Sequence, residues 1–303
     1  MSLRNNSLQQ KRILLLSAMV SPLLHAASDC NWSTVVLVGG LCTALCFGLD
    51  VLADCYLVPL RLERIQGVWS AVVLSQLLMW VPNYWEGSGG LWTPLILLAL
   101  ASWTAGKGLG VSSRAAGVLS YFLLLIIGGI FLASIKEVQP ENLLPQWQLS
   151  GGKLIVVFLI PALMTGKPGN TWKTRLWIAL IGVLASVLVI GVLGMECALD
   201  VPEPFYELSR SIRFLSVTKR FESLASASLT IGMFLTSVFL LTRSDGESRQ
   251  IPVAAIITAV LLILRTEISD WILVMGCLIN WVLLPGVTAW KNNLRKTKKG
   301  VDK

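Results

Sequence analysis

The sequence has 303 residues, of which 54% are hydrophobic and only 14% are charged, and its mean hydropathy is +0.71. Soluble domains carry about 25% charged residues, so this composition excludes an ordinary soluble protein and indicates a polytopic membrane protein. The net charge of +8 does not indicate nucleic-acid binding, because six of the 25 basic residues lie in the final stretch 291–303. There they would hold that end of the chain in the cytoplasm.

Ten hydrophobic segments separated by short loops predict one all-α transmembrane domain over residues 1–303, with a basic tail from 290. The segments are 12–28, 33–53, 67–84, 91–106, 114–134, 152–166, 174–195, 223–242, 251–266 and 268–289. With the N-terminus inside, 18 of the 25 Lys and Arg residues fall on the cytoplasmic side. This asymmetry favours cytoplasmic N- and C-termini.

Two of the segments are irregular. The uncharged run 154–165 is 12 residues long, which as a helix covers about 18 Å against a hydrocarbon core of about 30 Å. Pro161 interrupts it, and Pro22 interrupts the first segment in the same way. Proline-broken segments at matching positions of two halves are typical of the binding site of a transporter; the alternative is a pair of membrane helices that tolerate a proline.

The start of the chain has a second interpretation. Lys11 and Arg12, the apolar run and the sequence His25-Ala26-Ala27 resemble a cleavable signal peptide. The late position of Pro22 and the membrane segment that follows favour an uncleaved first helix.

Polar residues beside the two prolines are the candidate ligand-binding groups, because a broken helix frees backbone donors and acceptors. His25 could bind a ligand, or it could reach water at the membrane interface. The candidate set is Ser17, Ser21, Pro22, His25, Pro161, Thr165 and Gly166. These groups suit a small neutral or zwitterionic nutrient.

No arrangement of catalytic side chains is found in the sequence, so an enzyme is not expected, and neither is a cofactor or a metal site. The glycine-rich run 106–110 lacks the Lys-Ser/Thr pair of a phosphate-binding loop. It favours a tight turn.

Residues 203–220 have the apolar spacing of an amphipathic helix on the outer membrane surface. Its basic residues are Arg210, Arg213, Lys219 and Arg220, and the acids Glu203, Glu207 and Glu222 lie near enough to neutralise much of this charge. This helix is either an ion-paired cap or a lid over a binding site.

Short motifs along the chain resemble the spore germination permeases, the B subunits of nutrient germinant receptors. Trp92-Thr93-Pro94, the turn from Ala105 to Arg114 with Gly108, and Asn142-Leu143-Leu144-Pro145 match family patterns in order and spacing. So do Pro204-x-x-Glu207-Leu208-x-Arg210 and Lys219-Arg220-Phe221-Glu222. Gly110 stands where the family often has glutamate.

The resemblance implies a ten-helix fold of the amino acid/polyamine transporter type, with two inverted five-helix repeats (about 12–134 and 152–289) and helices 1 and 6 broken or shortened. It implies that an A-type subunit and a C-type lipoprotein subunit assemble with the chain in the spore inner membrane, and that it senses a small-molecule germinant, commonly an amino acid. Membrane lipids would be its other partners, and no nucleic acid.

The sixth segment departs from the family because about half a helix is missing before Pro161, which puts the implied pocket in question. The expected function is therefore a B-type germinant receptor subunit. The alternatives are an amino-acid permease of the same fold and a non-binding structural subunit of the receptor.

Overall fold

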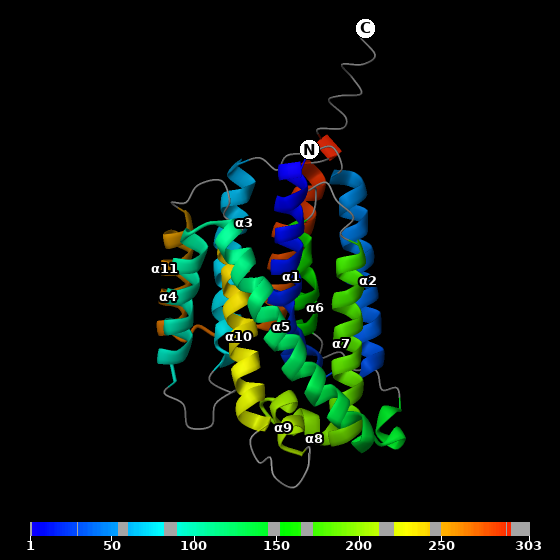
Figure 1. The fold of residues 1–303 in the computed structure, drawn as a ribbon. Helices are drawn as coiled ribbons and strands as arrows, with labels where there is room; N and C mark the ends of the chain where they lie inside the picture. Colours follow the sequence, from blue (N-terminus) through cyan, green and yellow to red (C-terminus); the bar gives the residue numbers. More distant parts are fainter. Residues whose placement is uncertain are drawn as a thin grey trace.

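The computed structural model describes residues 2–28, 30–53, 60–81, 90–144, 152–164, 172–211, 221–242, 250–288 and 290–291. The described chain is a bundle of helices. The start of α1 and the last helical residues lie at the same end of the bundle (Figure 1). The α-helices are α1 (Ser2–Ser28), α2 (Trp32–Ala53), α3 (Leu60–Leu78), α4 (Trp92–Gly106), α5 (Leu109–Ser134), α6 (Gly152–Leu159), α7 (Trp172–Leu193), α8 (Met195–Asp200), α9 (Pro204–Ser211), α10 (Phe221–Thr242), α11 (Gln250–Ile263) and α12 (Asp270–Cys277).

The membrane-protein prediction is supported by five helical stretches that are long and apolar enough to cross a bilayer. They are Trp32–Leu49, Leu109–Glu137, Lys173–Leu193, Glu222–Thr242 and Asp270–Thr288. Four shorter apolar helices accompany them: Arg12–Ser28, Trp92–Gly106, Gly152–Leu163 and Ile251–Ile263. Each of the ten predicted segments contains a helix, whereas ten crossings and the two inverted repeats stay predictions.

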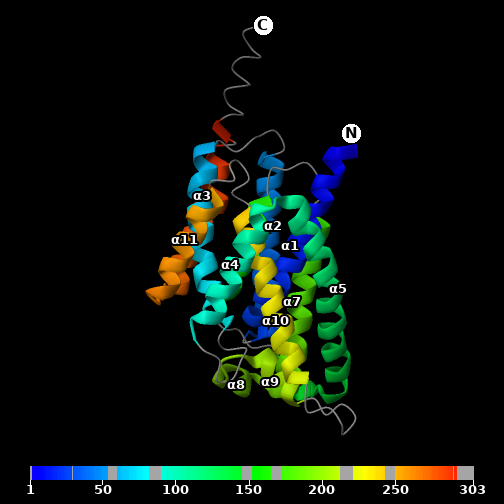
Figure 2. The same cartoon turned by 60° about the vertical axis from the view of Figure 1, so that its left-hand side comes forward.

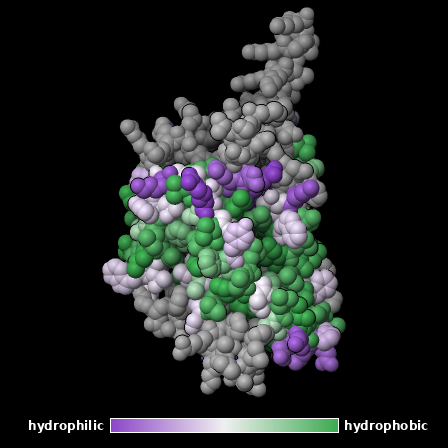
Figure 3. All heavy atoms as spheres, in the orientation of Figure 1, coloured by the Kyte–Doolittle hydropathy of each residue, from purple (hydrophilic) through white to green (hydrophobic). Residues whose placement is uncertain are grey.

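A hydrophobic band crosses one face of the described bundle (Figure 3). Figure 3 shows apolar side chains in a band across the middle of the visible face, with hydrophilic residues gathered toward both ends. Exposed leucine, phenylalanine and tryptophan side chains such as Phe122, Leu125 and Trp177 form part of the outer surface. In water such a surface would be unfavourable, whereas in a bilayer it is the expected lipid contact.

The centre of the bundle is formed by α1 and α10, which pack against each other and both against α5; α1 also packs against α7, and α10 against α4. The α10 span is 72% buried, against 28% for the α5 span. A helix that is apolar around most of its circumference requires such a central position. The core helix α1 therefore has protein on nearly all sides from Leu14 to Ser28.

The first helix is not broken. The sequence predicts an interruption at Pro22, but α1 is continuous from Ser2 to Ser28 with Pro22 inside it. The sixth segment is short as predicted: α6 has eight residues and continues as a 3₁₀ turn, Ile160–Met164, that contains Pro161. At about 1.5 Å per α-helical and 2.0 Å per 3₁₀ residue, this segment is about 22 Å long.

Two short helices close the end of the bundle opposite the N-terminus. Helices α8 and α9, together residues 195–211, lie side by side across that end in both views (Figures 1 and 2). We call these two helices the cap. They contact α7, and α9 also contacts α10 and α1.

Candidate functional site

A buried acid–base pair joins the core helix α1 to the cap. The side chains of His25, near the end of α1, and Glu203, just before α9, are 5% and 2% exposed. Nδ1 of His25 lies in hydrogen-bond contact with Oε2 of Glu203. Since a carboxylate only accepts hydrogen bonds, the Nδ1–H group is the donor.

An aromatic ring and a second base complete this site. The indole of Trp80 stacks on His25 with ring centroids 4.0 Å apart and planes 19° from parallel. On Trp80 in turn lies the ammonium group of Lys153, 5.9 Å from the ring centroid. We call His25, Glu203, Trp80 and Lys153 the His25 cluster. Its members come from α1, the start of α9, the turn after α3 and the start of α6.

One carboxylate oxygen of Glu203 is an unsatisfied hydrogen-bond acceptor. Oε1 of Glu203 is buried and has no hydrogen-bond partner among the described residues. Leaving a buried acceptor without a donor is unfavourable by about 1–3 kcal/mol, and more when the group is charged. The cluster therefore contains a buried acceptor that an additional hydrogen-bond donor would stabilise.

The cap is positioned by apolar packing and by its first turn. The carbonyl of Glu203 accepts hydrogen bonds from the backbone N–H groups of Tyr206 and Glu207, which starts α9 at this residue. Phe205 and Leu208 are fully buried, and Phe205 meets Phe131 of α5 edge-on at 6.1 Å. The predicted amphipathic helix is confirmed over Pro204–Ser211; the rest of the stretch, 212–220, lies outside the described residues.

The charged face of the cap is an ion-paired network. Arg210 lies 3.0 Å from Glu207 and 3.4 Å from Glu222 at the start of α10, and all three are substantially exposed. The predicted pairing of Glu207 and Glu222 with the basic group is thus confirmed. Glu203 differs, because it is buried and pairs with His25 instead of with an external arginine. Arg220 lies outside the described residues.

The predicted ligand groups Ser17 and Ser21 make hydrogen bonds within the protein. Ser17 donates to the carbonyl of Ile13 in its own helix, 2.8 Å away. The hydroxyl of Ser21 donates to the carbonyl of Leu229 in α10, at 2.7 Å. Both hydroxyls are therefore engaged within the protein, and the bond of Ser21 also ties α1 to α10.

Pro22 is tolerated because α10 supplies the hydrogen bond that the proline cannot make. A proline at position 22 leaves the carbonyl of Ala18, four residues earlier, without its helical donor. The hydroxyl of Thr236 donates to this carbonyl at 2.5 Å. Gly232 makes the close approach possible, since a Cβ atom there would lie 2.6 Å from that of Ser21. Neighbouring helices satisfy proline-freed carbonyls in this way in membrane proteins.

The second predicted break does not lie in the His25 cluster. Pro161 is buried in the 3₁₀ turn after α6, and Lys153 at the other end of α6 is the residue that joins the cluster. Thr165 and Gly166 lie outside the described residues. Of the five predicted ligand groups that the structure describes, His25 alone contacts another member of this cluster.

The residues that carry the family resemblance have local structural roles. Pro94 is buried in the first turn of α4, and Arg114 donates from Nε to the carbonyl of Gly110. Gly108 has φ +90° between α4 and α5, a conformation that favours glycine. The predicted tight turn is therefore confirmed. Pro145 lies outside the described residues.

Sequence reasoning missed Glu203, Trp80 and Lys153 as site residues. Glu203 was grouped with the ion-paired acids of the stretch 203–220, and no sequence pattern singled out Trp80 or Lys153 as a site residue. The only available signal was that an acid and the sole histidine both lie at predicted outer helix ends. Their pairing spans 178 residues of sequence, so no local pattern indicates it.

The sequence was compared with protein-family models and with curated proteins. No protein-family model matches the chain, and no curated protein sequence matches it. The resemblance to the germination permeases is therefore carried by its motifs alone.

Proposed function

We propose that this chain is a B-type subunit of a spore nutrient germinant receptor and that it senses a small zwitterionic nutrient at the His25 cluster. The single observation that carries the proposal is the buried His25–Glu203 pair, which links the core helix α1 to the cap. Ionisable residues at membrane depth are functional candidates by default. The motif resemblance supplies the receptor class.

The cluster has the charges that an amino acid requires. Oε1 of Glu203 accepts the ligand ammonium, and Lys153 supplies a positive charge for the ligand carboxylate. The stacked ring of Trp80 shields the pair from water. A charged hydrogen bond is worth about 1.5–3 kcal/mol, which corresponds to a factor of about 10 to 150 in affinity.

Signalling follows from the position of the pair. The hydrogen bond between Glu203 and His25 connects the start of the cap helix α9 to α1. A ligand ammonium group that binds Glu203 would weaken this hydrogen bond. Ligand binding thereby changes the free energy with which the cap is held on the bundle. A ligand shifts such an equilibrium only by its differential affinity for the two states. The cap is the surface that would pass this change to the A-type and C-type subunits.

The charge distribution supports cytoplasmic termini. In the described residues, Arg64, Lys107, Arg114 and Lys173 lie at the helix ends nearest the start of α1. Acidic residues prevail near the cap, among them Glu196, Asp200, Glu203, Glu207 and Glu222. Basic residues flank the cytoplasmic ends of membrane helices. The cap and the His25 cluster would then lie on the outer side, where a nutrient arrives.

A germination assay tests the proposal. Spores that carry Glu203→Gln, with the A-type and C-type subunits present, should need about tenfold more nutrient for half-maximal germination. The matched control is Glu207→Gln, four residues further along in the exposed network, and it should respond like the wild type. An unchanged response of Glu203→Gln spores at normal protein level would refute the proposal.

A second candidate, an amino-acid permease of the same fold, is favoured by one observation. Glu203 is a buried carboxylate paired with a histidine, and buried carboxylates of this kind serve ion coupling in transporters. Uptake of labelled amino acids into proteoliposomes distinguishes the two functions. Saturable accumulation that Glu203→Gln abolishes would favour the permease, and nutrient binding without accumulation would favour the receptor subunit.

A further inference from the structure

A groove on the outside of the bundle runs between α2 and α7. It has a volume of about 640 Å³ and is lined by 11 residues, six from α2 and five from α7. Both helices are membrane-crossing candidates, so the medium around this groove is lipid. We call it the α2–α7 groove.

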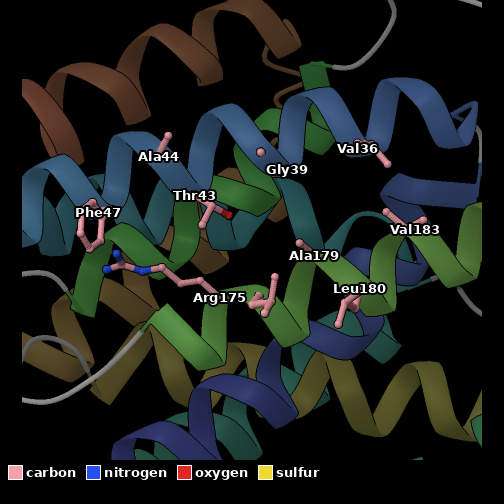
Figure 4. Close-up of a pocket in the computed structure, with 11 residues that line it drawn as sticks. Val36, Gly39, Thr43, Ala44, Phe47, Arg175, Ala179, Leu180 and Val183 are labelled. Carbon is pink, nitrogen blue, oxygen red and sulfur yellow. The ribbon is translucent and has the colours of Figure 1, made fainter.

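The lining is apolar along the groove and basic at one end. Apart from Thr43 and Arg175, the lining residues are glycines or carry hydrocarbon side chains. Val36 and Val183 lie toward one end, and Arg175 reaches toward Phe47 at the other (Figure 4). Arg175 is the fourth residue of α7. The basic end is therefore close to the membrane boundary on the side where α1 begins.

The length of the groove matches one leaflet of a bilayer. Val36 to Phe47 covers about 16 Å of α2, and Arg175 to Val183 covers about 12 Å of α7, at 1.5 Å per residue. The hydrocarbon core of a bilayer is about 30 Å thick, so one leaflet accounts for about half of that. A partner helix that crosses the membrane would need a contact surface along the whole core.

We propose that the α2–α7 groove binds an anionic phospholipid, with an acyl chain along the apolar lining and the phosphate at Arg175. Charge complementarity selects this occupant, because the only charged residue among the 11 is an arginine, whose planar guanidinium suits phosphate. Basic pockets between membrane helices bind anionic headgroups at this depth. The proposal is independent of the nutrient site, since the lining contains no member of the His25 cluster.

Gly40 provides a clean way to fill the groove. A Cβ atom at Gly40 meets nothing within 4 Å, and the same holds for Gly48, which is not part of the lining. Gly40→Leu therefore places a side chain in the groove from a position where its Cβ atom has room, and Gly48→Leu is the matched control on the same helix. Arg175→Gln removes the positive charge.

Native mass spectrometry of the delipidated full-length protein tests the proposal with three probes: phosphatidylglycerol, phosphatidylcholine with the same chains, and inorganic phosphate. The wild type should bind phosphatidylglycerol at least about fivefold more tightly than phosphatidylcholine. Gly40→Leu should weaken both lipids, Arg175→Gln should remove the preference, and Gly48→Leu should match the wild type. Inorganic phosphate alone should not bind measurably.

Several results would overturn the lipid site. Equal affinity of the wild type for the two lipids would contradict the role of Arg175. Equal lipid binding by Gly40→Leu and Gly48→Leu would place the lipid elsewhere. If Gly40→Leu changed the oligomeric mass and left lipid affinity intact, the occupant would be a second copy of the chain.

Discussion

The hydrogen bond between Thr236 and the carbonyl of Ala18 should be worth more than an ordinary interhelical hydrogen bond, because Pro22 removes the competing helical donor. Thr236→Val replaces the hydroxyl with a methyl group of similar size and leaves this buried carbonyl without a donor. Interhelical hydrogen bonds in membrane proteins average about 0.6 kcal/mol and reach about 1.7 kcal/mol. We expect a loss of unfolding free energy near the upper value, about 1–1.7 kcal/mol.

A double-mutant cycle isolates the effect. In a Pro22→Ala background, residue 22 has an N–H group that can bond to the carbonyl of Ala18, so Thr236→Val should be less destabilising there. The coupling energy should be about 0.5–1 kcal/mol. Unfolding free energies would be measured by reversible denaturation in mixed detergent micelles.

Thr258 offers a matched control. Its hydroxyl lies 2.9 Å from the carbonyl of Ala254 in its own helix and 3.1 Å from that of Ala71 in α3. The hydroxyl of Thr236 likewise has an own-helix carbonyl within reach, that of Gly232 at 2.9 Å, but its interhelical contact with Ala18 is the shorter one. The carbonyl of Ala71 keeps a helical donor, because residue 75 is a serine. Thr258→Val should therefore show no coupling to Pro22→Ala. Equal losses for Thr236→Val in the two backgrounds would refute the reasoning.

Two further substitutions test the packing of the core and the cap. Gly232→Ala should destabilise the protein by about 1–3 kcal/mol, because its methyl group would collide with Ser21; Gly117→Ala, which meets open space, should be neutral or stabilising by up to about 1 kcal/mol. A Gly232→Ala protein as stable as the wild type would contradict the close approach of α1 and α10. Arg210→Ala should lower stability by no more than about 1 kcal/mol, and by less at high salt, because its ion pairs are exposed. A larger or salt-independent loss of stability, measured by thermal unfolding, would contradict the view that these ion pairs are exposed and weak.

Hydrophobic runs predict much of this fold. Membrane helices are long, apolar and local in sequence, so composition alone indicates α2, α5, α7 and α10. The tight turn at Gly108 was also predictable from local sequence, because glycine readily adopts the positive φ that this turn requires.

The behaviour of α1 could not be predicted from the same information. A proline in a hydrophobic run has two outcomes, a break or a tolerated helix, and the choice depends on its neighbours. Here the neighbours are Thr236 and Gly232 of α10, and Thr236 is 218 residues from Ala18 in the chain. Ser21 was likewise predicted as a ligand group, but its hydroxyl bonds to a carbonyl 208 residues away.

Of the four residues of the His25 cluster, the sequence singled out His25 alone as a candidate. A histidine in a membrane helix is a candidate functional residue, because placing an ionisable side chain in lipid is energetically unfavourable. Its partner was hidden, because Glu203 is one of several acids in a charged stretch, and only tertiary structure separates it from Glu207. The sixth segment shows the opposite case, since its shortness follows directly from the sequence.

Nutrient affinity measured on the purified protein in lipid nanodiscs tests the central claim most directly. The nutrient would be an amino acid that triggers germination, titrated against the wild type, Glu203→Gln and the control Glu207→Gln. We predict that Glu203→Gln weakens binding by about 10- to 150-fold, the value of one charged hydrogen bond, while Glu207→Gln binds like the wild type. Equal affinities for all three proteins would show that the His25 cluster is not the nutrient site.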